Sequence, residues 1–117
     1  MEKIISGVLI KVKNLSLCKA FYRDVLELGE PVLNSSFLAE FRISDSFSLF
    51  LERDEWAEIP SVSGRVSWFC PGNADRIRKN LAAYGYPAPA PVCSEKAGIQ
   101  FCRFSDPEGN EILVADS

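Results

Sequence analysis

The chain has 117 residues, of which 47% are hydrophobic and 25% charged, the composition of one globular domain with a real core. Its formal net charge of −3 argues against a nucleic-acid partner, because such proteins carry a basic surface. It lacks an apolar run of about 18 residues, so no membrane span is expected. The N-terminal stretch lacks a signal-peptide pattern, and the four cysteines contain no CxxC pair. We therefore expect a cytoplasmic protein with reduced cysteines.

The first predicted elements are a strand and a helix. Alternating apolar side chains over 8–12 predict a strand with one buried face. Over 17–28 the apolar positions recur every three or four residues, which predicts an amphipathic helix. Asn14 or Ser16 is expected to cap its start, and Gly29 to end it.

Three short strands are predicted next, and then the whole pattern returns. The strands lie around 31–33, 37–43 and 47–52, with a turn at Ser44-Asp45. The second copy has alternation at Val66, Trp68 and Cys70, then a helix capped by Asn73 and ended by Gly85. Its last strands are predicted around 91–95, 99–105 and 111–115.

This order predicts an α+β fold of two βαβββ modules, over about 1–53 and 65–117, joined by a linker over about 54–64. The strands are expected to form one curved mixed sheet, with both helices on its convex face and a concave cleft. Trp56 in the linker is either a lid over this cleft or a packed loop side chain.

Three segments resemble one known group of proteins. They are VLIKVKNLSLCKAFYRDVLEL, RVSWFCPGNADRIRKNLAAYG and FSDPEGNEILV, and together they span nearly the whole chain. They are similar to the vicinal oxygen chelate superfamily, which includes glyoxalase I, bleomycin resistance proteins, fosfomycin resistance enzymes and extradiol dioxygenases. The DPEGN motif, 106–110, is built for a tight reversal, and we interpret it as a turn that positions the last strand.

The resemblance also implies where a metal ion would bind. It places ligand positions at Gly7, Arg65 and Leu113, and another near Phe50 or Glu52. The chain contains no histidine, glycine and leucine have no donor side chain, and arginine is a permanent cation. The chain therefore departs from the metalloenzymes and is closest to the metal-free, bleomycin-resistance-like members, so we expect no metal and no cofactor.

Strand alternation predicts which side chains face the cleft. Aromatic rings could stack on a flat ligand, and guanidinium groups could bind a carboxylate or phosphate. Alternatively, the arginines pair with Glu40, Glu52 and Glu111 across the strands. The predicted ligand-binding residues are Arg42, Phe50, Glu52, Arg65, Phe69, Phe101, Arg103 and Leu113.

We therefore expect a metal-free protein that sequesters a small aromatic or anionic compound, with no nucleic-acid or membrane partner. The resemblance implies a homodimer. One alternative is an enzyme of the same superfamily with Glu52 or Glu40 as base and Arg65 as anion stabiliser, or with an unrecognised metal site. Another is a cleft filled by its own phenylalanine side chains, in a module that binds a protein partner.

Overall fold

The computed structural model describes residues 6–54, 66–87, 92–96 and 98–116. The chain divides into two compact units, Met1–Gly64 and Arg65–Ser117. Trp56, Arg65 and nearly all of the predicted linker fall outside the described residues.

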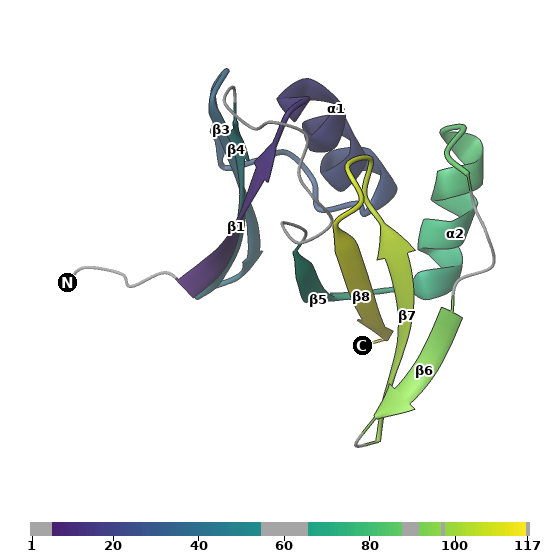
Figure 1. The fold of residues 1–117 in the computed structure, drawn as a ribbon. Coiled ribbons are helices and arrows are strands. Elements are labelled where there is room, and N and C mark those ends of the chain that lie inside the picture. Colours follow the sequence, from purple (N-terminus) through teal and green to yellow (C-terminus); the bar gives the residue numbers. More distant parts are fainter. Residues whose placement is uncertain (1–5, 55–65, 88–91, 97, 117) are drawn as a thin grey trace. The chain divides into compact units, whose positions relative to one another are not determined.

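The first unit has one four-stranded sheet in the order β1-β4-β3-β2. Strands β1 and β4 are parallel, and the other neighbours are antiparallel (Figure 1). The elements are β1 (Ser6–Val12), α1 (Leu15–Ala20), the π-helical turn η1 (Phe21–Val25), β2 (Leu33–Asn34), β3 (Leu38–Ser44) and β4 (Phe47–Arg53).

The second unit repeats this topology, with strand order β5-β8-β7-β6 and a parallel β5–β8 pair. The prediction of an α+β fold with two βαβββ modules is confirmed, but the described strands form two four-stranded sheets and not the single sheet that was expected. Within the described residues, no helix is both long and apolar enough to cross a membrane. The elements are β5 (Ser67–Gly72), α2 (Ala74–Ala83), β6 (Val92–Lys96), β7 (Ile99–Ser105) and β8 (Glu111–Asp116).

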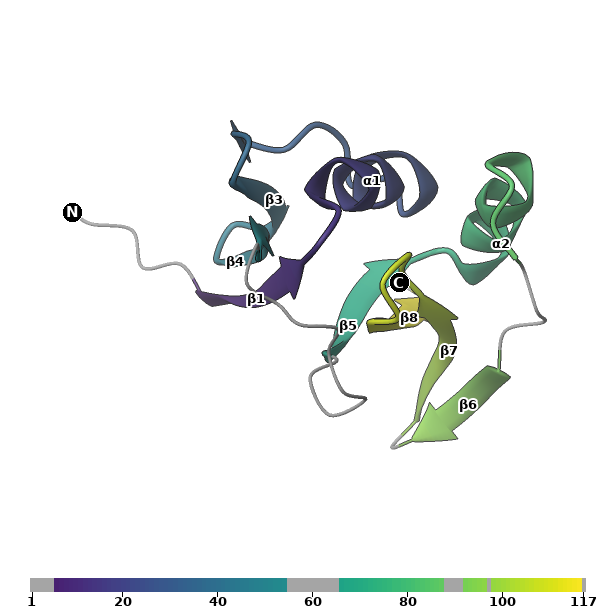
Figure 2. The same cartoon turned by 45° about the horizontal axis from the view of Figure 1, so that its top comes forward.

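The core of the first unit lies between its helical segment and one face of its sheet (Figure 2). Every second residue of β1, β3 and β4 points to this face, as the alternation predicted. The ring centroids of Tyr22 and Phe41 lie 6.3 Å apart across the interface. Burying each large apolar side chain stabilises the fold by about 1.5–3 kcal/mol. The buried set includes Ile10, Val12, Cys18, Phe21, Tyr22, Val25, Ala39, Phe41, Leu49 and Leu51.

The core of the second unit lies between α2 and one face of its sheet. Gly72 marks the close approach of this helix, since a Cβ there would lie 3.3 Å from Val114 Cγ1 and 3.5 Å from Ile77 Cδ1. Trp68 and Cys70 are buried, which confirms the predicted orientation of β5. The other buried apolar residues on this side of the sheet are Ala74, Ile77, Leu81, Cys102, Phe104, Ile112 and Val114, and Phe101 is buried on the opposite side.

The first helical segment begins as predicted but ends early. The side chain of Asn14 caps it by accepting a hydrogen bond from Leu17 N at 3.0 Å. The predicted end at Gly29 is wrong, because the segment closes as a π turn, with Leu26 N bonded to Phe21 O at 3.2 Å. Glu27 then reverses the chain with a φ of 58°. In the second unit Asn73 and Gly85 cap and end α2 as expected.

Two details of the strand predictions are wrong. The strand expected at 31–33 is β2, Leu33–Asn34. The turn expected at Ser44-Asp45 lies one residue further along, because a register shift after Arg42 pairs Ser44 with Phe47. Asp45 and Ser46 therefore form the loop between β3 and β4.

The cysteine prediction is wrong for two of the four residues. Cys93 and Cys102 form a disulfide, with their Cα atoms 4.1 Å apart. They face each other directly in the antiparallel β6–β7 pair, which places the two side chains on the same side of the sheet. Cys18 and Cys70 are buried thiols, as expected.

The DPEGN turn is held by Asp106. Its Oδ1 accepts hydrogen bonds from the backbone N–H groups of Glu108 at 2.8 Å and Asn110 at 2.9 Å. Its Oδ2 accepts one from the Asn110 side chain at 3.0 Å. Asn110 Oδ1 in turn accepts from Val66 N at 3.0 Å, so the turn also ties the start of β5 to β8. These contacts agree with a structural role for the motif.

Candidate functional site

Each sheet has a second face, opposite its helix, and the predicted ligand-binding residues within the described chain lie on these two faces. We call the face in the first unit the polar face and the one in the second unit the aromatic face. The polar face comprises Glu40, Arg42, Ser48, Phe50 and Glu52, and the aromatic face Phe69, Phe101, Arg103, Glu111 and Leu113.

Two rings form the centre of the aromatic face. Phe69 is 60% exposed, and its ring centroid lies 5.9 Å from that of Phe101, with the rings edge to face at 81°. Phe101 pairs in register with Ala115, whose small side chain leaves room for the rings to meet over β8. Phe101 itself is only 4% exposed, so a ligand would meet Phe69 first. Sequence reasoning had placed both rings on this face without distinguishing their accessibility.

Arg103 extends this aromatic row with a positive charge. Its Cζ lies 5.6 Å from the Phe101 ring centroid, within the range of a cation–π contact. Its Nε also lies 3.8 Å from Glu111 Oε2, and both side chains are about two-fifths exposed, at 42% and 41%. Such an exposed pair contributes little to stability. A ligand carboxylate could therefore replace Glu111 at the guanidinium with little loss of stability.

The polar face has a ring of hydrogen bonds among three side chains. Ser48 Oγ donates to Glu40 Oε2 at 2.7 Å, and Arg42 Nε donates to Ser48 Oγ at 3.2 Å. An Arg42 Nη atom closes the ring at 3.2 Å from Glu40 Oε2. Ser48 is fully buried, and the Glu40 side chain is 13% exposed. The network fixes Arg42 in one position, while its remaining N–H donors are available for an anion.

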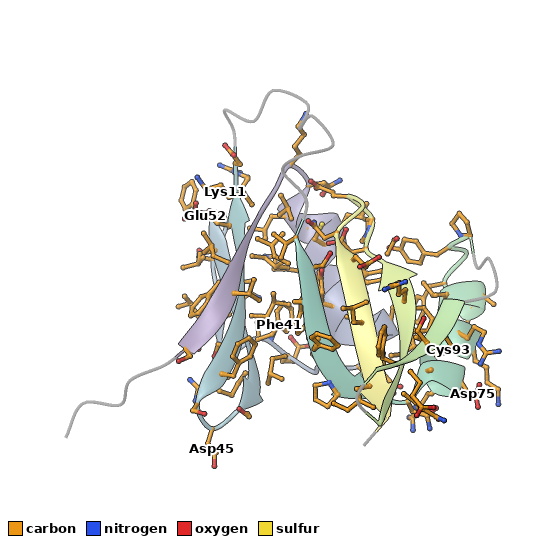
Figure 3. The ribbon with its side chains drawn as sticks, turned by 60° about the horizontal axis from the view of Figure 1, so that its bottom comes forward. Lys11, Phe41, Asp45, Glu52, Asp75 and Cys93 are labelled. Atoms are coloured by element: carbon orange, nitrogen blue, oxygen red, sulfur yellow. A yellow bond between two sulfur atoms is a disulfide. The ribbon has the colours of Figure 1, made fainter. Side chains whose placement is uncertain are left out.

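The remaining side chains of the polar face follow the β1–β4 register. Phe50 lies beside Leu9, which is 46% exposed, and Glu52 lies beside Lys11. Figure 3 shows Lys11 and Glu52 together at one end of this sheet, with Asp45 at the opposite end. The predicted pairing of arginine and glutamate across strands is found for Arg103 with Glu111. Arg42 pairs with Glu40 along the same strand, β3, and not across strands.

Comparisons with solved structures agree with this architecture. A glyoxalase/bleomycin resistance protein from Catenulispora acidiphila superposes with a TM-score of 0.69 at 18% identity, covering 97% of this chain and 98% of its own. The lactoylglutathione lyase of Agrobacterium tumefaciens gives 0.70 at 22% identity, covering 99% and 95%. The oxidase ChaP-H2 gives 0.71 at 15% identity, covering 100% and 95%.

The chain has the glyoxalase/bleomycin resistance fold. The sequence resemblance to the vicinal oxygen chelate superfamily is thereby supported at the level of the fold. No protein-family model matches the sequence, and no curated protein matches it. Identities of 15–22% establish the fold alone, so the activity has to be argued from the residues of the two faces.

The residues present do not fit the metal ion of the metalloenzymes that share this fold. A Cβ on Gly7 would lie 2.2 Å from the carbonyl oxygen of Ser48, so β1 offers no side-chain donor at that position and has no room for one. Leu113 is apolar. Within the described residues, His, Cys, Asp and Glu side chains nowhere gather in a group of three or more that could hold a metal. A divalent site needs about three or four such donors.

Sequence reasoning missed Ser48 and the disulfide. Ser48 is a small residue in an apolar strand, and its role depends on the register that places it beside Arg42. The sequence does contain a signal for the disulfide. Gly98 marks the hairpin turn, and Cys93 and Cys102 lie at equal distances along the chain from the point between residues 97 and 98.

Proposed function

We propose that this protein binds and sequesters a small compound that has both an aromatic ring and an acidic group, without using a metal ion. The observation that supports this function best is the row formed by Phe69, Phe101 and Arg103 on the aromatic face. An exposed ring next to an available guanidinium matches a planar aromatic acid. Phe69 would contact the ring of the ligand, and Arg103 would bind its carboxylate.

A ligand could bind here with little rearrangement of the side chains. Phe101 is held in place by Phe69 on one side and Arg103 on the other, so the site is preformed. The exposed Glu111 can give way to a ligand carboxylate. Preformed sites bind more tightly because little side-chain entropy is lost on association.

Titration with 2-naphthoate, followed by calorimetry and by thermal shift, tests this proposal. We expect binding that raises the melting temperature, because a ligand that binds only the native state stabilises it by mass action. Phe69→Ala and Arg103→Gln are each expected to raise Kd about tenfold, from the loss of a stacking or charge-assisted contact.

The chain supplies matched controls for both variants. Phe37 in the first unit is 61% exposed, close to the 60% of Phe69, so Phe37→Ala should leave Kd unchanged. Arg76, on α2, is also exposed, and Arg76→Gln should have no effect. If all four variants bind equally, or if the wild-type protein binds no compound in a panel of aromatic acids and phosphates, the proposal is wrong.

One observation favours the alternative of an enzyme with the same fold. Glu40 is a nearly buried carboxylate held beside Arg42, which is an arrangement suited to moving a proton next to a stabilised anion. Turnover on a panel of α-ketoaldehydes and small acids would support this function, provided that Glu40→Gln abolishes it while Glu30→Gln, at an exposed carboxylate of the same unit, does not. Binding of 2-naphthoate without turnover would support sequestration instead.

The homodimer implied by the resemblance is part of the proposal. Sedimentation velocity with and without 2-naphthoate gives the oligomeric state directly. A monomer at all concentrations would remove this part and leave the binding proposal intact, because every residue invoked on the aromatic face belongs to one unit of one chain.

A further inference from the structure

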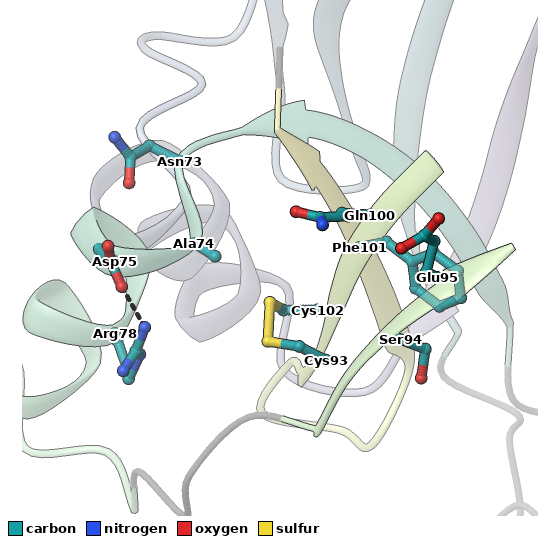
Figure 4. A pocket seen from close by; sticks show the side chains of 10 residues that line it. All are labelled: Asn73, Ala74, Asp75, Arg78, Cys93, Ser94, Glu95, Gln100, Phe101 and Cys102. Atoms are coloured by element: carbon teal, nitrogen blue, oxygen red, sulfur yellow. Dashed lines mark hydrogen bonds and ion pairs between the residues drawn. A yellow bond between two sulfur atoms is a disulfide. The ribbon is translucent and has the colours of Figure 1, made fainter. Parts of the chain in front are cut away.

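The Cys93–Cys102 disulfide borders a hollow of about 470 Å³ in the second unit (Figure 4). The hollow lies between the first turns of α2 and the β6–β7 hairpin, and Figure 4 shows both sulfur atoms on the side of the hairpin that faces α2. An Asp75–Arg78 ion pair lines the helix side. A volume of this size admits a small organic molecule. The other lining residues are Asn73, Ala74, Ser94, Glu95, Gln100 and Phe101.

The two sulfur-bearing residues differ in accessibility. Cys93 lies on β6, at the edge of the sheet, and is exposed, whereas Cys102 lies on β7, between two strands, and is 8% exposed. Attack on a disulfide requires access to one sulfur and departure of the other. The structure therefore favours attack at Cys93 Sγ, with the Cys102 thiolate as leaving group.

The other two cysteines are protected from this chemistry. Cys18 is fully buried and Cys70 is 2% exposed. Burial raises the pKa of the Cys70 thiol to about 11, so it is almost entirely protonated at neutral pH. Only thiolates exchange at useful rates. The chain thus has one accessible disulfide and two inert thiols.

We propose that Cys93 and Cys102 form a thiol–disulfide exchange site for low-molecular-weight thiols that enter this hollow. A small thiolate attacks Cys93 Sγ, forms a mixed disulfide there and releases Cys102 as a thiolate, which takes a proton from solvent. A second small thiolate then attacks the outer sulfur of this mixed disulfide, which came from the first small thiol, and the bond to Cys93 Sγ breaks. The products are the small disulfide and the Cys93 thiolate, so two electrons pass from two small thiols to the protein.

The reverse reaction restores the protein disulfide. The Cys93 thiolate attacks a small disulfide, and Cys102 resolves the adduct, because its Cα lies 4.1 Å from that of Cys93. This site shares Phe101 with the proposed ligand site, and Cys102 lies between Phe101 and Arg103 on β7, but the exchange chemistry uses only the two cysteines. The proposal does not depend on aromatic acids binding.

The test uses the full chain, 2-mercaptoethanol and its disulfide. Samples equilibrated at several thiol-to-disulfide ratios are quenched in acid, alkylated and mapped by mass spectrometry. We expect Cys93 and Cys102 to change state together with the ratio, while Cys18 and Cys70 become alkylated only after unfolding in guanidinium. The transient adduct is expected on Cys93.

Three variants locate the reaction. Cys102→Ser should accumulate the mixed disulfide at Cys93 at least about tenfold faster than Cys93→Ser does at Cys102, because thiol reactivity follows access. Gln100→Phe should slow adduct formation several-fold by narrowing the hollow. The neighbouring Ile99 is exposed but does not line the hollow, so Ile99→Phe should leave the rate unchanged.

Measurements on the wild-type protein alone can also overturn the proposal, so the test does not depend on whether a variant folds. Reduction that occurs only as fast as global unfolding would show a purely structural disulfide. Adducts found mainly on Cys18 or Cys70, or two thiols persisting at Cys93 and Cys102 under excess small disulfide, would also contradict it. Equal rates of adduct formation for Gln100→Phe and Ile99→Phe would show that the small thiol does not react through the hollow.

Discussion

At the residue scale, the Asp106 carboxylate holds the DPEGN turn together through hydrogen bonds. The carboxylate accepts three of them from within the turn 106–110, and Asp106 is 5% exposed. Hydrogen bonds to a charged group are worth more than neutral ones, and their loss leaves buried N–H groups without an acceptor. We expect Asp106→Ala to lower the free energy of unfolding by about 2–4 kcal/mol.

Asp45 provides the matched control, because it is an exposed aspartate in the tight turn between β3 and β4. Asp45→Ala should change stability by less than about 0.5 kcal/mol, as is usual for surface positions. Urea unfolding of both variants measures the difference. Equal losses would mean that the side-chain contacts of Asp106 do not stabilise the turn.

A second prediction at this scale concerns Cys70 and pH. Burial raises the pKa of its thiol from 9.0 to about 11, so the folded state favours the neutral thiol. The contribution of the Cys70 thiol to the free energy of unfolding is therefore complete below pH 9.0 and is lost as the pH rises towards 11. The pKa difference corresponds to about 2–3 kcal/mol. The stability advantage of the wild type over Cys70→Ala should therefore shrink across this range. A constant difference between the two proteins would contradict the assignment.

At the element scale, the β6–β7 hairpin depends on its disulfide. Strand β6 pairs only with β7 in the described sheet, and the cross-link closes a loop of about ten residues. In the chain-entropy model such a loop is worth about 2–3 kcal/mol. The double variant Cys93→Ser, Cys102→Ser should lose about this much stability by urea unfolding.

The same variant connects the hairpin to the proposed ligand. Cys102 lies between Phe101 and Arg103, so loosening β7 should also weaken 2-naphthoate binding. Wild-type protein in excess 2-mercaptoethanol should reproduce both effects, and the double variant should not respond to the reductant. A double variant as stable as the oxidised wild type would show that strand pairing alone holds the hairpin.

Strands that are short apolar runs bounded by turn residues were predictable from the sequence, and features set by long-range register were not. Strands β4, β7 and β8 agree with the prediction within one residue, because each is an apolar-rich segment that follows a turn. The end of the first helix was missed because Glu27, and not a glycine, takes the first positive φ. The ring of Glu40, Arg42 and Ser48 depends on the β3–β4 register that pairs Arg42 with Ser48, and local sequence does not encode this register.

At the scale of the whole molecule, the chain has the duplicated fold, but no donor side chain stands at Gly7 or Leu113, two of the metal-ligand positions that the resemblance implies. Gly7 also leaves no room for one, because a Cβ there would lie 2.2 Å from the carbonyl oxygen of Ser48. Replacing it by histidine would therefore disturb the strand pair before it could supply a ligand. The fold was predictable because patterns along the whole chain encode it, whereas the ligand depends on a few exposed side chains.

Metal binding offers a test at this scale. We expect oxidised protein, incubated with zinc, nickel or manganese and then desalted, to retain less than about 0.1 ion per chain, because three or four donors are needed for a stable site. Its melting temperature should be the same with these ions as with a chelator. The measurement is elemental analysis together with thermal shift.

An engineered zinc site provides a positive control for the thermal-shift measurement. Asp75 and Lys79 are exposed on α2 and lie one helical turn apart, so Asp75→His with Lys79→His creates a two-donor pair that binds zinc weakly, with water as the other ligands, when zinc is kept in excess. This double variant should be stabilised by zinc by mass action, and the wild type should not. Stoichiometric metal in the wild type would instead require donors outside the residues described here, and the metal-dependent reactions of this fold would again become candidates for its function.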